Sequence, residues 1–391
     1  MISVFLDHRA FVLDNLPLLG LLHWRVFSVL VVWKKLKATQ FGFGETQIQR
    51  NLRVDVLNPG GRDATQDFSG GLPSPNASVG HPPVNYHAYA ACTGGRFARR
   101  ISDVQAKVVL VLLRGDLSDS LRVGRKFTSH GIPFLISWKE AGYHQVAQSL
   151  SHAHVFTRFM EISQMAAGFL ASTPWLLPVY RAAHLALGEF IPTPYPLHFK
   201  EWDFRLPIEE RSGIFLGTRE FFVPSRNHAA AILSACELAL QLGGIRVTCI
   251  NTEGSRGHAL LRSIDAGRGV LQVIHGRLAY SNYLKLIAQH KVVLQFDRSG
   301  VPGQVAGDAT LCGVPSLGGG GALDDLLGSI YPVKGGDLLE TMVYASQLLT
   351  DLPLYREVTV ALRQRALETI SFIRCSEALR RLAREAIRSF R

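Results

Sequence analysis

The feature that most constrains the fold is a series of short apolar runs separated by helical stretches. In "AKVVLVLLRGD" the apolar residues are uninterrupted from Val108 to Leu113. A run of this kind is typical of a strand that is buried on both faces, as in parallel sheets covered by helices. Further runs occur at "RVDVLNPGGRD", "IPFLISWKEAG" and "GFLAST". The alternation predicts an α/β fold, a doubly wound parallel sheet with helices on both sides.

The same alternation starts again after a proline-rich stretch. Residues 188–213 contain four prolines, which exclude a regular helix and suit a semi-rigid crossing between domains. Strands are then predicted at "SGIFLGTRE", "GGIRVTCINTEG", "VLQVIHG" and "KVVLQFD". A chain of 391 residues is also longer than a domain with a single hydrophobic core usually is. We therefore expect two Rossmann-like domains facing across a cleft, over residues 51–200 and 201–352, with helices at 353–391.

Several single elements can be predicted from local patterns. Gly313 and Pro315 would stop a short helix, and the glycines at 318–321 would let another group approach the backbone closely. The patterns predict a strand at Val84–Cys92, helices at Pro174–Leu187, Arg226–Leu242 (capped by Ser225) and Val301–Cys312, and a C-terminal helix with Leu362, Ala366, Ile370 and Ile373 along one side.

Composition and charge narrow the class of partner. Hydrophobic residues make up 47% of the chain and charged residues 19%, as in an ordinary globular protein. The net charge of +11 favours an anionic partner, but the basic residues form no long block, so no nucleic acid is expected. The five cysteines include no CxxC pair, which argues against a zinc site or a disulfide framework. A cytoplasmic location without a bound metal is the resulting expectation.

The first 50 residues form an extension with an apolar stretch, Leu16–Trp33. It is long enough to span a bilayer, but His23 and Arg25 fall in its middle. An arginine near the bilayer centre costs about 2.5–3.5 kcal/mol on insertion scales. We expect a buried or interfacial helix, and a peripheral membrane contact stays open as the alternative. A secretory signal is not expected, because the small-residue cleavage site is missing.

Two loops carry the groups that could bind phosphate. Gly217, Thr218 and Arg219 follow a predicted strand, and Arg226 lies at the first turn of the next helix. A helix N-terminus and guanidinium groups both bind phosphate oxygens well. The alternative is that both arginines are ordinary surface residues. In the second segment, Asp308 lies within the predicted short helix Val301–Cys312. It is either a solvated acid or an acceptor for ribose hydroxyls.

Together the two segments resemble the donor-binding domain of GT-B glycosyltransferases, and most closely glycosyltransferase family 4. That family has a glycine–arginine loop with a later basic residue, matched here by Gly217, Arg219 and Arg226. It also has two glutamates eight positions apart, the second followed by a small-residue helix and "GVP". Asp308 stands at the second acid and Gly300 at the first, so the motif is degenerate. The resemblance spans roughly residues 51–391.

The resemblance implies a role for each matching residue. Arg219 and Arg226 would neutralise the diphosphate of a nucleotide-sugar donor, Asp308 would hold the ribose, and backbone N–H groups at Gly303 and Gln304 would contact phosphate or sugar. Asp297 is a candidate to replace the acid missing at Gly300. The last helix would pack back on the N-terminal domain. No metal or separate cofactor is implied.

The acceptor side would be formed by loops of the N-terminal domain. The candidates are Gly60, Gly61 and Asp63 after the first strand, and Lys139, Glu140 and His144 after a later one. A retaining enzyme needs no strong side-chain base, whereas an inverting enzyme would use Asp63, Glu140 or His144. The alternatives are that His144 is an ordinary loop or helix-start histidine, as most such histidines are, and that Lys139 and Glu140 form a surface ion pair worth less than about 1 kcal/mol.

These expectations combine into one function with an alternative. The chain is expected to move a sugar from a nucleoside-diphosphate sugar to a glycan, lipid-linked or small-molecule acceptor, most simply with retention. Gly300 favours the alternative, a non-catalytic protein that binds a nucleotide or sugar phosphate. A dehydrogenase is disfavoured because no GxGxxG opens a helix after the first strand of either domain.

Overall fold

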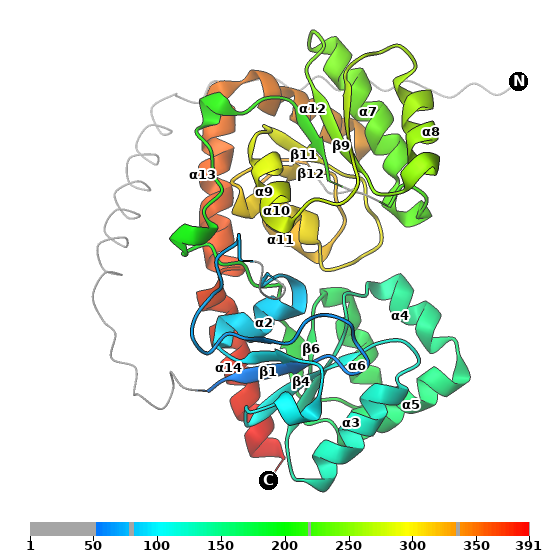
Figure 1. Cartoon of the computed structure of the whole chain (residues 1–391), viewed down its shortest axis with the longest axis vertical. Helices are drawn as coiled ribbons and strands as arrows, with labels where there is room; N and C mark the ends of the chain where they lie inside the picture. Colours follow the sequence, from blue (N-terminus) through cyan, green and yellow to red (C-terminus); the bar gives the residue numbers. More distant parts are fainter. Residues whose placement is uncertain (1–51, 78–81, 218–219, 334–336, 391) are drawn as a thin grey trace, which may run out of the picture. The chain divides into compact units, whose positions relative to one another are not determined.

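Two β-sheets, each with helices on both faces, form the framework of the protein (Figure 1). The computed structural model describes residues 52–77, 82–217, 220–333 and 337–390. The predicted N-terminal apolar helix lies outside these residues. Within them, no helix is long and apolar enough to cross a membrane.

The N-terminal lobe is built on a seven-stranded sheet in the order β2-β3-β1-β4-β5-β6-β7, parallel except for β2. Its strands are β1 Val54–Leu57, β2 Gln66–Asp67, β3 Arg96–Ala98, β4 Val108–Leu113, β5 Phe134–Trp138, β6 Gly168–Ala171 and β7 Gly188–Phe190. Its helices are α2 Asn85–Thr93, α3 Ser118–Ser129, α4 Tyr143–Leu150, α5 Ala153–Met165 and α6 Leu177–Ala182.

Strand β4 explains why this sheet is covered on both faces. All six residues are fully buried, and alternate side chains enter two different clusters. Val109, Val111 and Leu113 pack with α3 and α5, whereas Val108, Leu110 and Leu112 pack with α2 and α14. Each buried Val or Leu side chain contributes about 1.5–3 kcal/mol, so the uninterrupted apolar run needs both layers. The predicted strand is confirmed.

The C-terminal lobe has a five-stranded parallel sheet in the order β10-β9-β8-β11-β12. Its strands are β8 Ile214–Leu216, β9 Val247–Asn251, β10 Leu271–His275, β11 Val292–Leu294 and β12 Ser316–Leu317. Its helices are α7 His228–Gln241, α8 Gly254–Asp265, α9 Tyr280–Ala288, α10 Gln304–Leu311, α11 Ala322–Gly328 and α12 Leu338–Thr350. Short 3₁₀ turns lie at Ile101–Asp103, Pro174–Leu176, Lys200–Trp202, Ile208–Glu210 and Pro224–Arg226.

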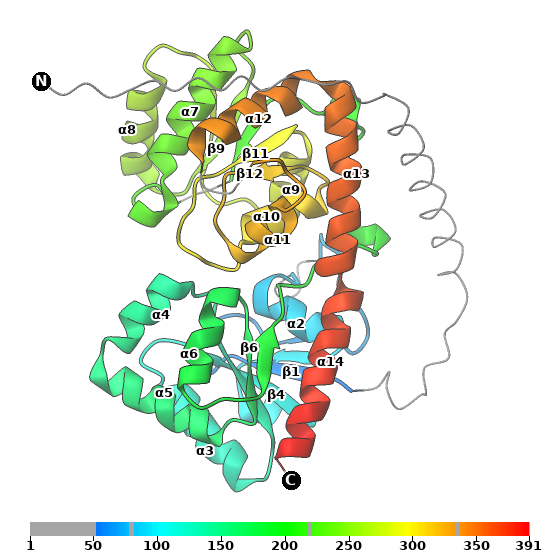
Figure 2. The same ribbon diagram turned by 180° about the vertical axis from the view of Figure 1, so that it is seen from behind.

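The chain passes between the lobes twice, and the two passages are bonded to each other. The first is the proline-rich stretch and the second joins α13 Leu352–Thr369 to α14 Phe372–Ser389. Tyr195 N–H donates to Ile370 O at 2.7 Å, and Phe372 N–H donates to Tyr195 O at 3.0 Å. Helix α13 packs on the C-terminal lobe and α14 on α2 of the N-terminal lobe, as Figures 1 and 2 show from opposite sides.

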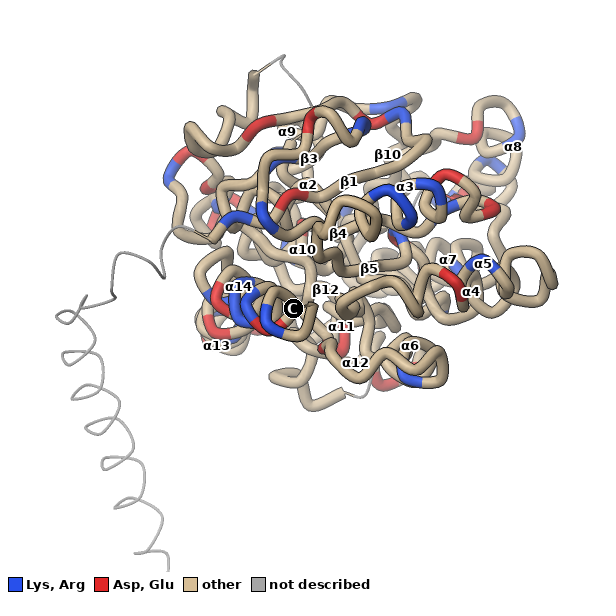
Figure 3. The backbone as a smooth tube through the Cα atoms, turned by 90° about the horizontal axis from the view of Figure 1, so that it is seen from below, with Lys and Arg blue, Asp and Glu red and all other residues tan. Residues whose placement is uncertain are grey.

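The two lobes, over residues 52–391, form one compact unit. The last helix does pack back on the N-terminal lobe, as the resemblance implied. Basic residues are spread over several elements, including α3 and α14, in agreement with the sequence (Figure 3).

Several local predictions are wrong. Residues 84–92 form no strand but most of α2, whose small residues pack under α14. The helix predicted at Pro174–Leu187 ends at Ala182, and residues 183–187, with His184 at φ 63°, form a turn before β7. Helix α7 begins at His228, which leaves Arg226 in a 3₁₀ turn ahead of it. In the tail, Ile373 is 52% exposed, since the break before α14 resets the helical phase.

Candidate functional site

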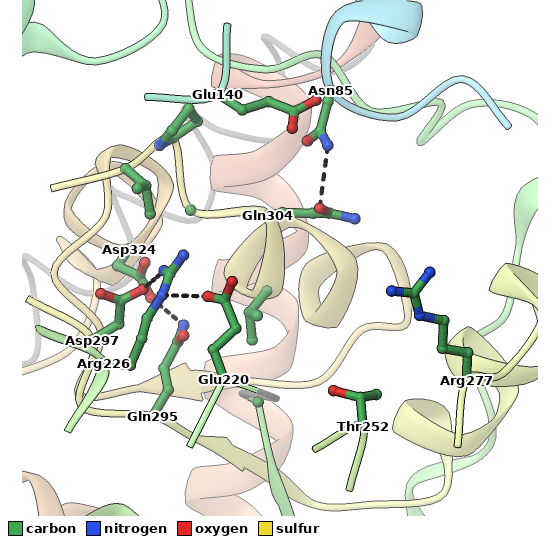
Figure 4. A pocket seen from close by; sticks show the side chains of 15 residues that line it. Asn85, Glu140, Glu220, Arg226, Thr252, Arg277, Gln295, Asp297, Gln304 and Asp324 are labelled. Carbon is green, nitrogen blue, oxygen red and sulfur yellow. Dashed lines mark hydrogen bonds and ion pairs between the residues drawn. The ribbon is translucent and has the colours of Figure 1, made fainter. Parts of the chain in front are cut away.

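A cavity of about 530 Å³ lies at the carboxyl ends of the strands of the C-terminal lobe. The loops after β8, β9, β10 and β11 all contribute to its wall, as expected for an open parallel sheet. Residues of the N-terminal lobe close the opposite side (Figure 4). The lining residues are Asn85, Glu140, Gly217, Glu220, Arg226, Thr252, Arg277, Gln295, Asp297, Val301, Pro302, Gly303, Gln304, Val305 and Asp324.

Arg226 is held in this cavity by two carboxylates. Its Nε donates to Glu220 Oε2 at 2.8 Å, and its Nη1 pairs with Asp297 Oδ2 (Figure 4). The other oxygen of Asp297 accepts from the backbone N–H of Ser299 at 2.8 Å. The neighbouring Asn227 donates to Phe296 O at 2.9 Å and joins the two loops. Arg226 is therefore placed for an anion, but its charge is already balanced.

The start of α10 forms another part of the wall. Gly303, Gln304 and Val305 line the cavity, so the N-terminal turn of the helix faces it. The first N–H groups of a helix have no partner within the helix, and they carry a partial positive charge. The Gln304 side chain also accepts a 3.3 Å hydrogen bond from Asn85 of the N-terminal lobe (Figure 4). This end of α10 can receive an anion.

Asp324 is a half-buried residue of the same wall and accounts for two of the four successive glycines, Gly319 and Gly321. Its Oδ1 accepts from Gln295 Nε2 at 2.8 Å, and its Oδ2 accepts from Gly321 N–H at 3.1 Å. A Cβ atom at Gly319 would overlap the carboxylate, and one at Gly321 would come within 2.8 Å of it. The glycines therefore let the main chain wrap around this acid.

The enclosure changes how readily Asp324 ionises. Burial, with smaller effects from the nearby Asp297 and Asp325 carboxylates, raises the pKa of Asp324 to about 7. The hydrogen bonds from Gly321 and Gln295 oppose this rise but do not cancel it. A carboxyl that titrates near neutral pH in a cavity is a candidate functional group.

The two lobes touch beside the cavity. At Gly142, which precedes α4, an added Cβ would overlap Ser299 O and lie 2.7 Å from Gly300 O. A Cβ added at Gly300 would lie 3.7 Å from the Trp175 ring and 3.9 Å from the backbone nitrogen of Tyr143, both in the N-terminal lobe. A side chain at position 300 would therefore point at the N-terminal lobe.

Of the five described non-glycine residues with positive φ, three lie in or beside the cavity, and Leu117 and His184 lie elsewhere. Asn85, Glu140 and Asn227 have φ of 49°, 53° and 50°, a left-handed conformation that is uncommon for residues with a side chain. Asn85 and Glu140 line the cavity, and Asn227 follows Arg226. Such strain persists where the surrounding structure demands it, often at functional sites.

Solved structures with the same architecture are glycosyltransferases. Sucrose-phosphate synthase from Thermosynechococcus elongatus matches with a TM-score of 0.54 at 15% identity, over 85% of this chain and 99% of that one. A UDP-forming α,α-trehalose-phosphate synthase from Burkholderia xenovorans gives a TM-score of 0.51 at 12% identity, over 72% and 74%. Anabaena HepE in complex with UDP-glucose gives 0.50 at 10% identity, over 70% and 77%.

The protein has the GT-B fold. No family model and no curated protein matches the sequence. Because the identities are low, the likeness establishes the fold, and the closer resemblance to family 4 stays a prediction. Within the GT-B fold, the cavity lies where the two lobes face each other.

The GT-B fold brings together some of the predicted donor residues. Gly217, Arg226, Asp297, Gly303 and Gln304 all line the cavity. Thr218 and Arg219 lie outside the described residues. The roles of these residues in binding stay predictions, but their convergence on one cavity is a structural fact.

Asp308 lies elsewhere. It is 1% exposed, and its Oδ1 accepts from Tyr195 at 3.1 Å and Tyr280 at 2.6 Å. It does not belong to the cavity lining. Burial under two tyrosines does not favour the predicted contact with ribose, nor a solvated surface position.

The acceptor-side candidates are only partly assembled. Lys139 Nζ lies 2.7 Å from Asp63 Oδ2 and 3.7 Å from Glu140 Oε1. Glu140 lines the cavity, but His144 is an exposed residue of α4 and does not. Gly60 and Gly61 lie beside Asp119 and Asn58, away from the cavity lining. Of these residues, Glu140 alone is placed to meet a ligand there.

Sequence reasoning missed several lining residues, which are Asn85, Glu220, Thr252, Arg277, Gln295 and Asp324. Thr252 and Gln295 directly follow strands. They could have been predicted, because ligands of open parallel sheets bind beyond the carboxyl ends of the strands. Asn85 was hidden by the wrong strand prediction. Across the described ranges, no group of three metal-ligating side chains is found.

Proposed function

We propose that the protein is a glycosyltransferase that uses a nucleoside-diphosphate sugar. The sugar would pass to a glycan, lipid-linked or small-molecule acceptor with retention of configuration. The observation that carries the proposal is the cavity itself. On one side it is lined by the start of α10, Arg226 and two carboxylates, Asp297 and Asp324. On the other side it is lined by residues of the N-terminal lobe, within a GT-B fold.

Each part of the cavity would have a role in this reaction. The departing diphosphate gathers negative charge as the glycosidic bond breaks, and preorganised N–H groups and guanidinium groups stabilise that charge. The start of α10 and Arg226 would supply both. Asp297 would contact the sugar in place of the acid that Gly300 lacks. Glu140, from the opposite lobe, would face the acceptor.

The cavity is more acidic than a diphosphate site requires. Its described lining holds four carboxylates but only two guanidinium groups, those of Arg226 and Arg277. A diphosphate would therefore have to compete with Glu220 and Asp297 for Arg226. This competition lowers the net contribution of Arg226 to binding, because its pairing in the free protein must first be broken.

A panel of nucleotide-sugars tests the proposal directly. The protein is incubated with each donor and a mixture of sugar, sugar-phosphate and lipid-linked acceptors, and the released nucleoside diphosphate is measured. Release from one donor that depends on an acceptor is the expected result. If no donor binds and none releases diphosphate, the proposal is rejected.

We expect Arg226→Ala to weaken binding of the preferred nucleoside diphosphate by about tenfold, the value of a partly compensated charged hydrogen bond. Isothermal titration calorimetry measures the change. Glu220→Gln makes a matched comparison, because it leaves the arginine and removes one competing charge. This variant should bind severalfold more tightly. Unchanged affinity in both variants would remove Arg226 from the donor site.

A second candidate is a protein that binds a nucleotide or sugar phosphate without transferring sugar. The observation that favours it is the pairing of Arg226 with two carboxylates, together with glycine at position 300. The donor panel separates the two candidates. Tight binding of a nucleotide-sugar with no release in the presence of any acceptor would support the second.

A further inference from the structure

A buried acid and two tyrosines connect the cavity helix to the passages between the lobes. Tyr195 donates to Asp308 Oδ1 at 3.1 Å, and Tyr280 donates to the same oxygen at 2.6 Å. Asp308 and Tyr195 are 1% and 2% exposed. The three residues belong to different segments, which are α10, the proline-rich passage and α9. They form a polar contact inside an otherwise apolar cluster.

Tyr195 lies where the chain passes between the lobes. Its backbone bonds to Ile370 and Phe372, at the junction of α13 and α14, so both passages meet at this residue. Its ring lies against Gly307, where an added Cβ would overlap it. Its hydroxyl also lies 3.1 Å from Gln304 O, at the first residue of α10. Tyr195 thus contacts the second passage through its backbone and α10 through its side chain.

The two tyrosines keep their protons under ordinary conditions. Burial, followed by the effect of the Asp308 carboxylate, raises the pKa of Tyr195 well above its usual value. The same causes raise the pKa of Tyr280. Both hydroxyls therefore remain hydrogen-bond donors toward Asp308.

We propose that Asp308 is a positioning residue, which through Tyr195 fixes the cavity end of α10 relative to the two passages between the lobes. Its side chain has no direct contact with the donor. The start of α10 would then keep its place when the lobes move, because it is tied to the point where they are joined. The effect on ligand binding rests on the proposed function, but the effect on α10 does not.

The test uses ligands that differ in whether they contain ribose. Binding of UDP, or of GDP where the wild type prefers it, is compared with binding of inorganic pyrophosphate. A ribose contact would affect only the nucleotide, whereas a displaced α10 would affect both ligands. We expect Asp308→Asn and Tyr195→Phe each to weaken both ligands by about tenfold, as for loss of one charge-assisted hydrogen bond.

A second readout needs no ligand. Hydrogen exchange of the backbone N–H groups at residues 304–308 should be faster in both variants than in the wild type. Tyr355→Phe is the matched control, because Tyr355 is also fully buried and its hydroxyl also forms a hydrogen bond, accepting from Arg211. It lies near the start of α13, at the other end of that helix from Ile370. The control should leave both ligand binding and exchange in α10 unchanged.

Three results would overturn the proposal. In the first, Asp308→Asn weakens the nucleotide but not pyrophosphate, while Tyr195→Phe changes neither, which would make Asp308 a ribose ligand. In the second, exchange at residues 304–308 is the same in the wild type and both variants. In the third, hydrogen exchange at residues 304–308 is as fast in Tyr355→Phe as in Asp308→Asn and Tyr195→Phe. If the wild type binds neither ligand, the proposed function fails, and the exchange measurement still decides the role of Asp308.

Discussion

Gly142→Ala is expected to lower kcat for sugar transfer by about 100-fold, the cost of misplacing reacting groups by about 1 Å. The new Cβ would overlap Ser299 O, so the lobes could not approach as they do in the structure. Asn85 and Glu140 would then lie farther from α10 and Arg226, which line the other side of the cavity. Binding of the nucleoside diphosphate alone should change little, because Arg226 and α10 belong to one lobe.

The substitution has little effect on folding by itself. Gly142 has φ −88° and ψ 176°, a conformation that alanine adopts without strain. Gly70→Ala is a suitable control, because an added Cβ there meets nothing within 4 Å. Small-angle scattering supplies a readout without substrate, and a larger radius of gyration is expected for Gly142→Ala. Unchanged kcat and unchanged scattering would show that this contact does not set the distance between the lobes.

The affinity for the nucleoside diphosphate is expected to fall as the pH rises through about 7. Asp324 has a pKa of about 7 in the free protein, and its ionised form repels an anion in the cavity. The protonated form therefore binds the ligand better, so binding takes up a proton. Between about pH 6 and about pH 8 the affinity should fall by nearly tenfold. A single titrating group can change the affinity by at most about tenfold per pH unit, so the expected loss lies within this limit. Calorimetry in buffers of different ionisation enthalpy measures both affinity and proton uptake.

Asp324→Asn separates this effect from titration of the nucleotide itself. The Gln295 amide can turn over and present its oxygen to the new asparagine, so the hydrogen bonds can be rebuilt. The variant should retain only the pH dependence of the ligand. An identical pH profile in the wild type and the variant would contradict the assignment.

Stability gives an independent check on the same group. The folded-state pKa of Asp324 lies above the ordinary value of 3.8, so the folded protein binds the proton more tightly than the unfolded chain. The free energy of unfolding should therefore fall as the pH rises between these two pKa values. The melting temperature of the wild type should drop relative to Asp324→Asn over this range.

The framework of the protein could be predicted because its signals are local. Uninterrupted apolar runs such as Val108–Leu113 have no other way to bury both faces, so strand and layer order follow from the sequence. Gly313, with φ 69°, ends α10 as predicted. The rule that loops after parallel strands meet at one edge of the sheet brought Arg226 and Gly303 to the same side, although Arg226 was predicted in the first turn of α7 and lies in the 3₁₀ turn before it.

The remainder depends on contacts between distant segments. Most residues of α2 are buried, so its sequence shows no clear helical period. The helix that covers it, α14, lies some 290 positions later in the chain, so no local pattern reveals the contact. Nothing local distinguishes Asp308 in a buried cluster from Asp308 in a cavity, because Tyr195 and Tyr280 come from other elements. The importance of Asp324 likewise depends on Gln295, which lies on a neighbouring loop.

The main chain around Asp324 limits how the ligand preference of the cavity could be redesigned. Larger residues at positions 303, 319 or 321 would collide with the carboxyl group or approach it closely, so this wall cannot be reshaped one side chain at a time. Glu220 and Val305 belong to the same lining but carry side chains that can be replaced without changing these glycines. A library directed at these two positions would leave Asp324 and the main chain around it intact.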